Sequence, residues 1–127
     1  MRRTEQRRAA VVALYQSDLN GRNPREVLEP TARAFTRELV QGVEHWREEI
    51  DGLIERHAEG WTLDRIAPLE RNILRVALFE VLHRSDVPAE VAIDEAVEAA
   101  KELCGAEAPG FLNGILGAVL RESVGSA

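Results

Sequence analysis

The residues best suited to chemistry stand at the start of the chain, where arginines are concentrated. Residues 1–8 have a net charge of +3 although the whole chain carries −6, so the remaining residues carry −9. The four arginines of this stretch are Arg2, Arg3, Arg7 and Arg8. A basic segment on an acidic body favours contact with a polyanion at one end of the protein. A solvated terminus without a partner is the alternative, and charge alone weighs the two about equally.

The histidines and the single cysteine offer no comparable site. His45, His57 and His83 lie far apart and form no His-Glu-x-x-His motif, and there is no Cys-x-x-Cys pair. His57 lies in an apolar stripe near a helix end, where we expect a hydrogen bond or the helix dipole to hold it. Cys104 is expected in the core. Nothing in these residues argues for an enzyme, and we predict no metal site and no cofactor.

The spacing of the apolar residues places the arginines relative to the core. The apolar face of the first segment is formed by Val11, Leu14, Tyr15 and Leu19. Arg7 and Arg8 project onto nearly the same face, one turn earlier. Since unpaired arginines are not buried, we expect this first turn to overhang the core and to present both guanidinium groups to solvent.

A long helix is predicted next. Its apolar stripe runs from Phe35 to His57, which predicts one element over 31–57 with a kink near Gly42. Gly60 is expected to end it.

The second half of the chain is predicted to hold a central helix. Residues 69–82 are apolar on nearly every side, as in a helix covered by its neighbours. Glu80 lies inside this stretch. We predict that it pairs with Arg84, one turn later, and does not act as a catalytic acid.

Two more helices complete the chain. Ser85 or Asp86 is expected to cap a helix whose buried stripe runs from Ile93 to Cys104, and Pro109 is expected to begin the last helix.

These patterns predict an all-α fold, a compact helical bundle. A chain of 127 residues makes one domain, or two small subdomains that share a core. One cysteine excludes an internal disulfide. No apolar run approaches the ~20 residues that span a bilayer, and the first residues lack the apolar run of a signal peptide. We therefore expect a soluble cytoplasmic protein that does not bind membranes.

Three stretches of the sequence resemble the bacterial transcription antitermination factor NusB family. They are RRTEQRRAAVVALYQSDL at the front, LERNILRVALFEVLHRSDVPAEVAIDEAVEAAKEL in the second half and GFLNGIL near the end. The resemblance runs over essentially the whole chain, in order and without a large insertion. Other helical bundles would share the hydrophobic pattern but not the loop residues of these stretches.

The resemblance implies an all-α fold of two small helical subbundles, here about 1–60 and about 61–127, in one RNA-binding domain. It also implies a role without catalysis. NusB pairs with NusE, a small-subunit ribosomal protein, and the pair recognises a single-stranded leader element, boxA. Through this complex it helps RNA polymerase to elongate across ribosomal RNA operons.

The resemblance further assigns site residues. The arginines Arg2, Arg3, Arg7 and Arg8 match RNA-contacting positions, and replacing Arg7 and Arg8 by alanine is expected to abolish RNA binding while leaving the helices intact. The other matched positions are Tyr15 near the RNA and NusE surfaces, Glu107 and Phe111 near the RNA, and Asp64 and Glu70 facing NusE. Arginines beside aromatic rings suit single-stranded RNA, which exposes phosphates and unstacked bases.

The chain also departs from the family pattern. Ala106 stands where an acidic residue is usual, and Gly110 stands where a lysine or arginine is usual. Thr4 and Glu5 interrupt the basic segment. We therefore expect weak RNA binding by the protein alone and dependence on its partner.

Two other readings remain open at this point. A NusB-like domain also forms the front of a ribosomal-RNA cytosine methyltransferase, whose catalytic domain would need a few hundred more residues. The second alternative is a helical interaction module, such as a homodimer, that does not bind RNA.

Overall fold

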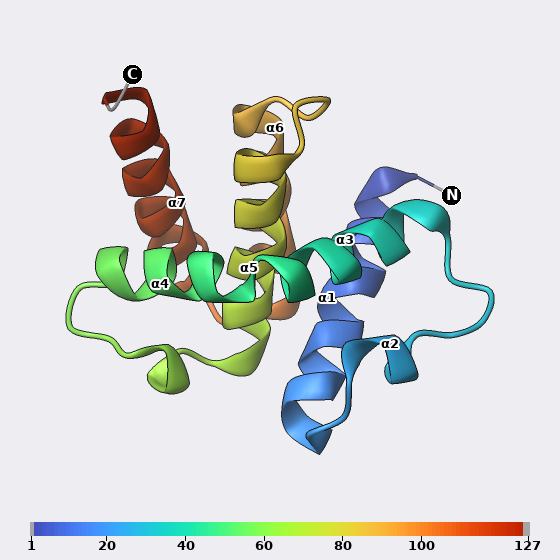
Figure 1. The fold of residues 1–127 in the computed structure, drawn as a ribbon. Coiled ribbons are helices and arrows are strands. Elements are labelled where there is room, and N and C mark those ends of the chain that lie inside the picture. Colours follow the sequence, from blue (N-terminus) through green and yellow to red (C-terminus); the bar gives the residue numbers. More distant parts are fainter. Residues whose placement is uncertain (1, 126–127) are drawn as a thin grey trace.

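The structure is a computed structural model that describes residues 2–125. The described chain is helical throughout and contains no strand, which confirms the predicted all-α class. Its elements, shown in Figure 1, are α1 (Arg3–Asn20), α2 (Pro24–Val27), α3 (Ala34–His45), α4 (Arg47–His57), the short 3-10 helix η1 (Leu63–Arg65), α5 (Pro68–His83), α6 (Ala89–Leu103) and α7 (Ala108–Gly125). None of the described helices is both long and apolar enough to cross a membrane.

Helix α5 forms the centre of the fold, as its nearly continuous apolar sequence predicts. Every residue from 72 to 80 is buried. The helix contacts α1, α3, α4, α6 and α7, and α1 and α7 lie on opposite sides of it in Figure 1. Most of the core is formed by the side chains that these helices turn toward α5. The fold is therefore organised around a single element that has almost no solvent-facing side.

The predicted helix over 31–57 is wrong as one element, because the structure divides it at Trp46 into α3 and α4. Figure 1 shows the two helices end to end across one face of the molecule. Gly42 is not the break. A Cβ atom on Gly42 would lie 2.2 Å from the ring of Phe79 on α5, so this glycine allows α3 to approach α5 closely.

The predicted cap of α6 is also wrong. Pro88, and neither Ser85 nor Asp86, occupies the N-cap position. Asp86 instead accepts two hydrogen bonds from Arg84 and lies 3.2 Å from the Arg3 guanidinium. Hydrogen bonds from Arg84 and then from Arg3, acting against a smaller effect of burial, lower the pKa of Asp86 to about 2. The Asp86 side chain, one of the two predicted caps, is therefore engaged in ion pairs.

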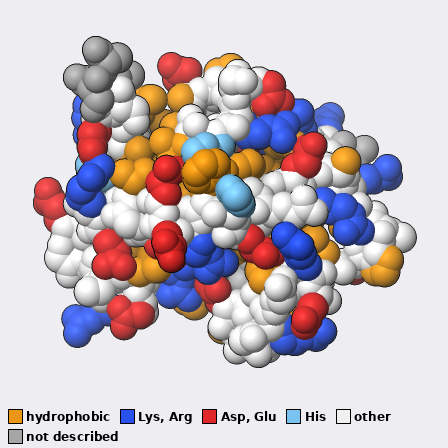
Figure 2. Space-filling model, viewed as in Figure 1, with side chains coloured by type: hydrophobic (Ala, Val, Ile, Leu, Met, Phe, Trp, Pro, Cys, Tyr) orange, Lys and Arg blue, Asp and Glu red, His pale blue; other side chains and the backbone are white. Residues whose placement is uncertain are grey.

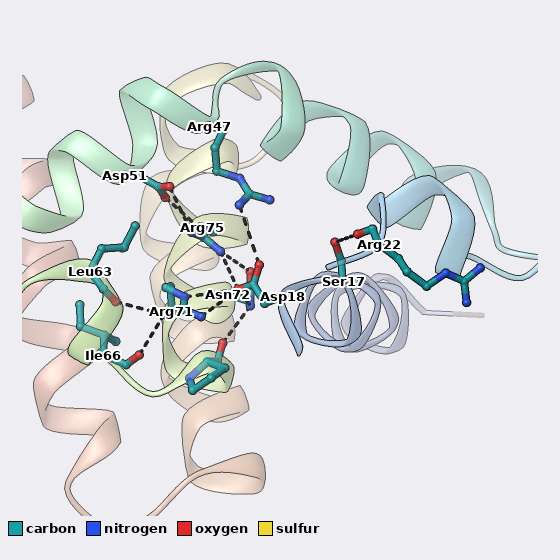
Figure 3. Close-up of polar contacts among 11 residues, drawn as sticks. Ser17, Asp18, Arg22, Arg47, Asp51, Leu63, Ile66, Arg71, Asn72 and Arg75 are labelled. Atoms are coloured by element: carbon teal, nitrogen blue, oxygen red, sulfur yellow. Dashed lines mark hydrogen bonds and ion pairs between the residues drawn. The ribbon is translucent and has the colours of Figure 1, made fainter. Parts of the chain in front are cut away.

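A polar cluster centred on Asp18 joins α1 to α4 and α5 (Figure 3). The Asp18 carboxylate accepts hydrogen bonds from Arg71, Asn72 and Arg75, at 3.1, 2.9 and 2.9 Å, and is 3.9 Å from Arg47. Although burial raises the pKa of Asp18, hydrogen bonding from Asn72 and the charge of Arg75 bring it below its ordinary value. The ionised carboxylate is therefore the state that this cluster stabilises.

The same cluster reaches two further elements. Arg75 binds Asp51 of α4 through two hydrogen bonds of 2.8 and 3.1 Å. Arg71 donates to the backbone carbonyls of Leu63 and Ile66, at the two ends of η1. The cluster thus fixes α1, α4, α5 and η1 relative to one another (Figure 3).

The division into subbundles near residue 60 stays a prediction. Helices α1, α2 and α3 contact one another, and so do α5, α6 and α7. Helix α4, which precedes residue 60, contacts both α5 and α7. The two halves therefore share a continuous packed interior in the described chain.

We expect Asp18→Ala to destabilise the protein by about 3 kcal/mol, because the substitution leaves several partly buried arginines without their shared carboxylate. Urea unfolding followed by circular dichroism measures the change. Asp94→Ala is the matched control, since Asp94 is exposed on α6, and we expect it to change stability by less than about 0.5 kcal/mol. Equal effects of the two substitutions would contradict the assigned role of Asp18.

Candidate nucleic-acid interface

Arg7 is buried, so the expectation that its guanidinium faces solvent is wrong. Its exposed fraction is 6 %, and its Nε and Nη2 atoms donate to the two carboxylate oxygens of Glu80, both at 2.8 Å. Glu80 is 1 % exposed. The physical reason is that a fully paired guanidinium can be buried, and the sequence pattern did not reveal a partner 73 positions away.

This pairing also corrects the prediction for Glu80. Its carboxylate is bound to Arg7 of α1, and Arg84 instead pairs with Asp86 and with Glu38 of α3. Helix α1 is therefore attached to α5 by a two-point charged contact inside the protein.

The other arginines at the start of the chain differ in how much of their side chain is exposed. Arg8 is half-buried, and its Nε atom donates to Glu102 at 3.0 Å. Arg3 is exposed, lies 3.2 Å from Asp86 and places its guanidinium 4.2 Å from the centre of the Phe35 ring. Arg2 is exposed and has no ion pair within the described residues. Only part of the predicted basic segment is therefore accessible to a polyanion.

An outward-facing apolar stripe follows the arginines along α1. Val12 is 41 % exposed and Leu19 is 58 % exposed, while Tyr15 between them is half-buried. Residues at these intervals share one helix face. The placement of Leu19 in the core stripe is wrong, because Ser17 and Asp18 take the inward positions of the last turn. Helix α1 ends at Asn20, and Gly21 follows it in the left-handed conformation with φ +66°.

A second cluster lies where η1, α5 and α7 meet. A cleft of about 300 Å³ is lined by two aromatic residues and three charged ones, Trp61, Phe111, Arg65, Glu70 and Glu107, together with Ile66, Ala67 and Ala108. The Trp61 and Phe111 rings meet edge to face, with centroids 6.2 Å apart. The structure thus places Glu70, which the resemblance assigned to the NusE surface, beside Glu107 and Phe111, which it assigned to RNA. The fold places them around one aromatic surface.

Trp61 was missed by the sequence reasoning. It lies in the loop after Gly60, is 49 % exposed and belongs to no apolar stripe. A large aromatic residue between a helix stop and the next helical turn is itself a signal, since such a side chain is usually buried unless it has a partner.

The acidic groups around the cleft differ in their environments. Burial raises the pKa of the Glu70 carboxyl above its ordinary value, so a hydrogen-bond donor placed in the cleft would relieve an unfavourable charge. Asp64 lies outside the cleft lining and is exposed, and a hydrogen bond with Thr62 lowers its pKa. Glu107 immediately precedes α7 and is exposed. The cleft therefore offers hydrogen-bond acceptors beside aromatic rings.

The histidines and the cysteine lie outside this cleft. His57 contacts Glu122, as expected for a hydrogen-bonded histidine near a helix end, and His83 lies 2.7 Å from Glu49. Cys104 is half-buried beside the core, and burial raises the pKa of its thiol. Among residues 2–125, no group of three potential ligands is placed to hold a metal ion.

The face formed by α3 and α4 has a different character. Figure 2 shows hydrophobic side chains gathered around histidines in the middle of this face, with acidic and basic side chains interspersed elsewhere. Trp46, at the joint of α3 and α4, stacks on His83 with ring centroids 3.9 Å apart. Interspersed charges of both signs make this face a poor match for a polyanion.

Comparison with known proteins identifies the relatives of this chain. The sequence model described as the NusB family matches residues 4–121. The transcription antitermination protein NusB of Myxococcus xanthus is 43 % identical over 128 residues, with 91 % of each chain covered. A structure of T. maritima NusB superimposes with a TM-score of 0.86 at 34 % identity, covering 96 % of this chain and 92 % of that one. A crystal structure of the antitermination factors NusB and NusE in complex with dsRNA gives a TM-score of 0.82 at 28 % identity, covering 96 % and 99 %.

We expect Arg7→Ala to destabilise the protein by about 4 kcal/mol, because it leaves Glu80 as an unpaired buried carboxylate. Urea unfolding measures this loss. Arg2→Ala is the control, and we expect a change below about 0.5 kcal/mol because Arg2 is exposed. The double variant Arg7→Met/Glu80→Met removes both charges and should be more stable than Arg7→Ala. Full stability of Arg7→Ala would show that the pair is dispensable.

Proposed function

The chain belongs to the NusB family of transcription antitermination proteins, and on this premise we propose that it binds single-stranded boxA leader RNA together with the ribosomal protein NusE. Through NusE it contacts the elongating RNA polymerase indirectly and supports transcription of ribosomal RNA operons, in the cytoplasm and without catalysis of its own. The observation that carries this proposal is the aromatic cleft formed by the exposed Trp61 and the half-buried Phe111, with Glu70 and Glu107 beside it.

The cleft supplies the chemistry that single-stranded RNA requires. Unstacked bases stack on exposed aromatic side chains, and each such contact contributes about 1–3 kcal/mol. The carboxylate of Glu107 accepts hydrogen bonds from base amino groups. We assign base contacts to this cleft and phosphate contacts to the exposed and half-buried arginines at the start of the chain.

Few arginines are available for phosphate. With Arg7 committed to Glu80, the phosphate contacts are left to Arg2, Arg3 and Arg8. Three contacts on a single strand give a slope of log affinity against log salt no steeper than about −2, compared with about −3 for four contacts. Binding by the protein alone is therefore weak at cellular salt, which supports a requirement for NusE.

The partner surface is assigned to the outward stripe of α1. Val12, Tyr15 and Leu19 present apolar area that this chain does not cover, and Asp64 and Glu70 supply acidic groups. A partner that covers the stripe removes this apolar area from water, which stabilises a complex. A second copy of the chain is the alternative occupant of the same stripe.

We expect Trp61→Ala and Phe111→Ala each to weaken binding of boxA RNA by roughly tenfold in the presence of NusE, because each removes a stacking surface. Electrophoretic mobility shifts with a titrated protein measure the affinity. Trp46→Ala is the matched control, since Trp46 is the other exposed tryptophan and stacks on His83 outside the cleft. Equal affinities for all the variants would contradict the assignment of the cleft to RNA.

We expect Leu19→Ser to weaken association with NusE about tenfold, since a leucine buried in an interface contributes about 1.5–3 kcal/mol. Stability of the isolated protein should change by less than about 0.5 kcal/mol. Copurification with tagged NusE and isothermal titration calorimetry measure the association. Val91→Ser, at the 44 % exposed Val91 of α6, is the control. Unchanged NusE affinity in Leu19→Ser, with loss of a dimer in analytical ultracentrifugation, would favour the homodimer instead.

A further inference from the structure

A carboxylate faces each of the three paired arginines of α1, and these pairs differ in their access to solvent. Arg7 is bound to Glu80 inside the protein. Arg3 pairs with Asp86 and Arg8 pairs with Glu102 at the surface. A carboxylate and a phosphate present similar anionic oxygens to a guanidinium. These acidic side chains therefore occupy the places that RNA phosphates would take.

Exposure decides which of these carboxylates a phosphate can replace. The side chain of Glu80 is 1 % exposed, so a phosphate does not reach its pair with Arg7 in the folded protein. The side chain of Glu102 is 62 % exposed and approaches Arg8 only at its Nε atom, at 3.0 Å. Asp86 is exposed as well, but it also holds Arg84 through two hydrogen bonds. Glu102 is therefore the carboxylate whose main described contact is a basic residue assigned to RNA.

A second carboxylate is already placed beside Arg8. Glu95 accepts a hydrogen bond from the Thr4 hydroxyl at 2.8 Å through Oε1. Its Oε2 atom is buried without a hydrogen-bond donor and lies 4.0 Å from the Arg8 guanidinium. Arg7 and Arg8 thus face three carboxylates, those of Glu80, Glu95 and Glu102. An incoming phosphate meets an acidic excess at Arg8.

We propose that Glu102 sets the affinity of this protein for RNA by competing with a phosphate for Arg8. The inference rests on the proposed function and extends it to a residue of α6. While Glu102 holds Arg8, the guanidinium is neutralised within the protein and releases few counterions when RNA binds. RNA binding is consequently weaker, and its dependence on salt is shallower, than the number of arginines implies.

The test compares Glu102→Gln with Glu98→Gln. Both residues lie on α6 one turn apart, their side chains are 62 % and 64 % exposed, and each substitution removes one negative charge. Glu98 pairs with Lys101 and not with an arginine of α1. The affinity for boxA RNA is measured at several KCl concentrations with NusE at saturation. The pair therefore separates local competition at Arg8 from a general change in net charge.

We expect Glu102→Gln to bind boxA RNA about three- to fivefold more tightly, the effect of freeing an exposed ion pair, and Glu98→Gln to stay within about twofold of the parent. The slope of log affinity against log salt should steepen by about 0.7 in Glu102→Gln alone, the value of one added phosphate contact. In an Arg8→Ala background, Glu102→Gln should give no gain.

Three outcomes would overturn the inference. Equal affinities of the parent and both variants would reject it while leaving the proposed function in place. An equal gain in Glu98→Gln, or a gain that persists in the Arg8→Ala background, would assign the effect to net charge. Absence of RNA binding by all proteins, with NusE present, would overturn the proposed function and this inference together.

Discussion

The buried ion pair between Arg7 and Glu80 is the contact on which the arrangement of this fold depends. Two charges are out of water, and their burial is tolerated only because the guanidinium and the carboxylate meet through two hydrogen bonds of 2.8 Å. That geometry fixes the position of α1 along α5. The position of α1 along α5 in turn determines what the residues before and after Arg7 contact. Arg8 and Arg3 reach the acidic side of α6 and its preceding loop, and Val12 and Leu19 face outward.

Local patterns in the sequence predicted the elements that local forces decide. The apolar residues around 69–82 predicted a central helix, because a helix that is apolar on nearly every side must be covered by its neighbours. The division of 31–57 at Trp46 was not predictable from periodicity, since α3 and α4 continue one stripe in phase. The role of Gly42 depends on Phe79, a residue of another helix, and could not be inferred from its own neighbourhood.

The candidate site, too, depends on contacts between residues that are distant in the sequence. Glu70, Glu107 and Phe111 were assigned by the resemblance to a family and not by their spacing. Their convergence with Trp61 depends on the path of the chain through η1, which the Asp18 cluster fixes through Arg71. The error for Arg7 arose because helical spacing gives the direction of a side chain but not the charge that it meets. The Arg7 side chain is buried because its partner, Glu80, lies on another helix and is distant in the sequence.

The two tryptophans occupy separate surroundings, which gives the protein two built-in optical reporters. Trp46 lies flat against the His83 imidazole, with an angle of 12° between the rings, whereas Trp61 meets the edge of Phe111. The surroundings of Trp46 therefore depend on how the α3–α4 joint packs on the end of α5. The surroundings of Trp61 depend instead on the occupancy of the cleft. Variants that keep only one of the two tryptophans would therefore report separately on the α3–α4 joint and on the cleft beside α7.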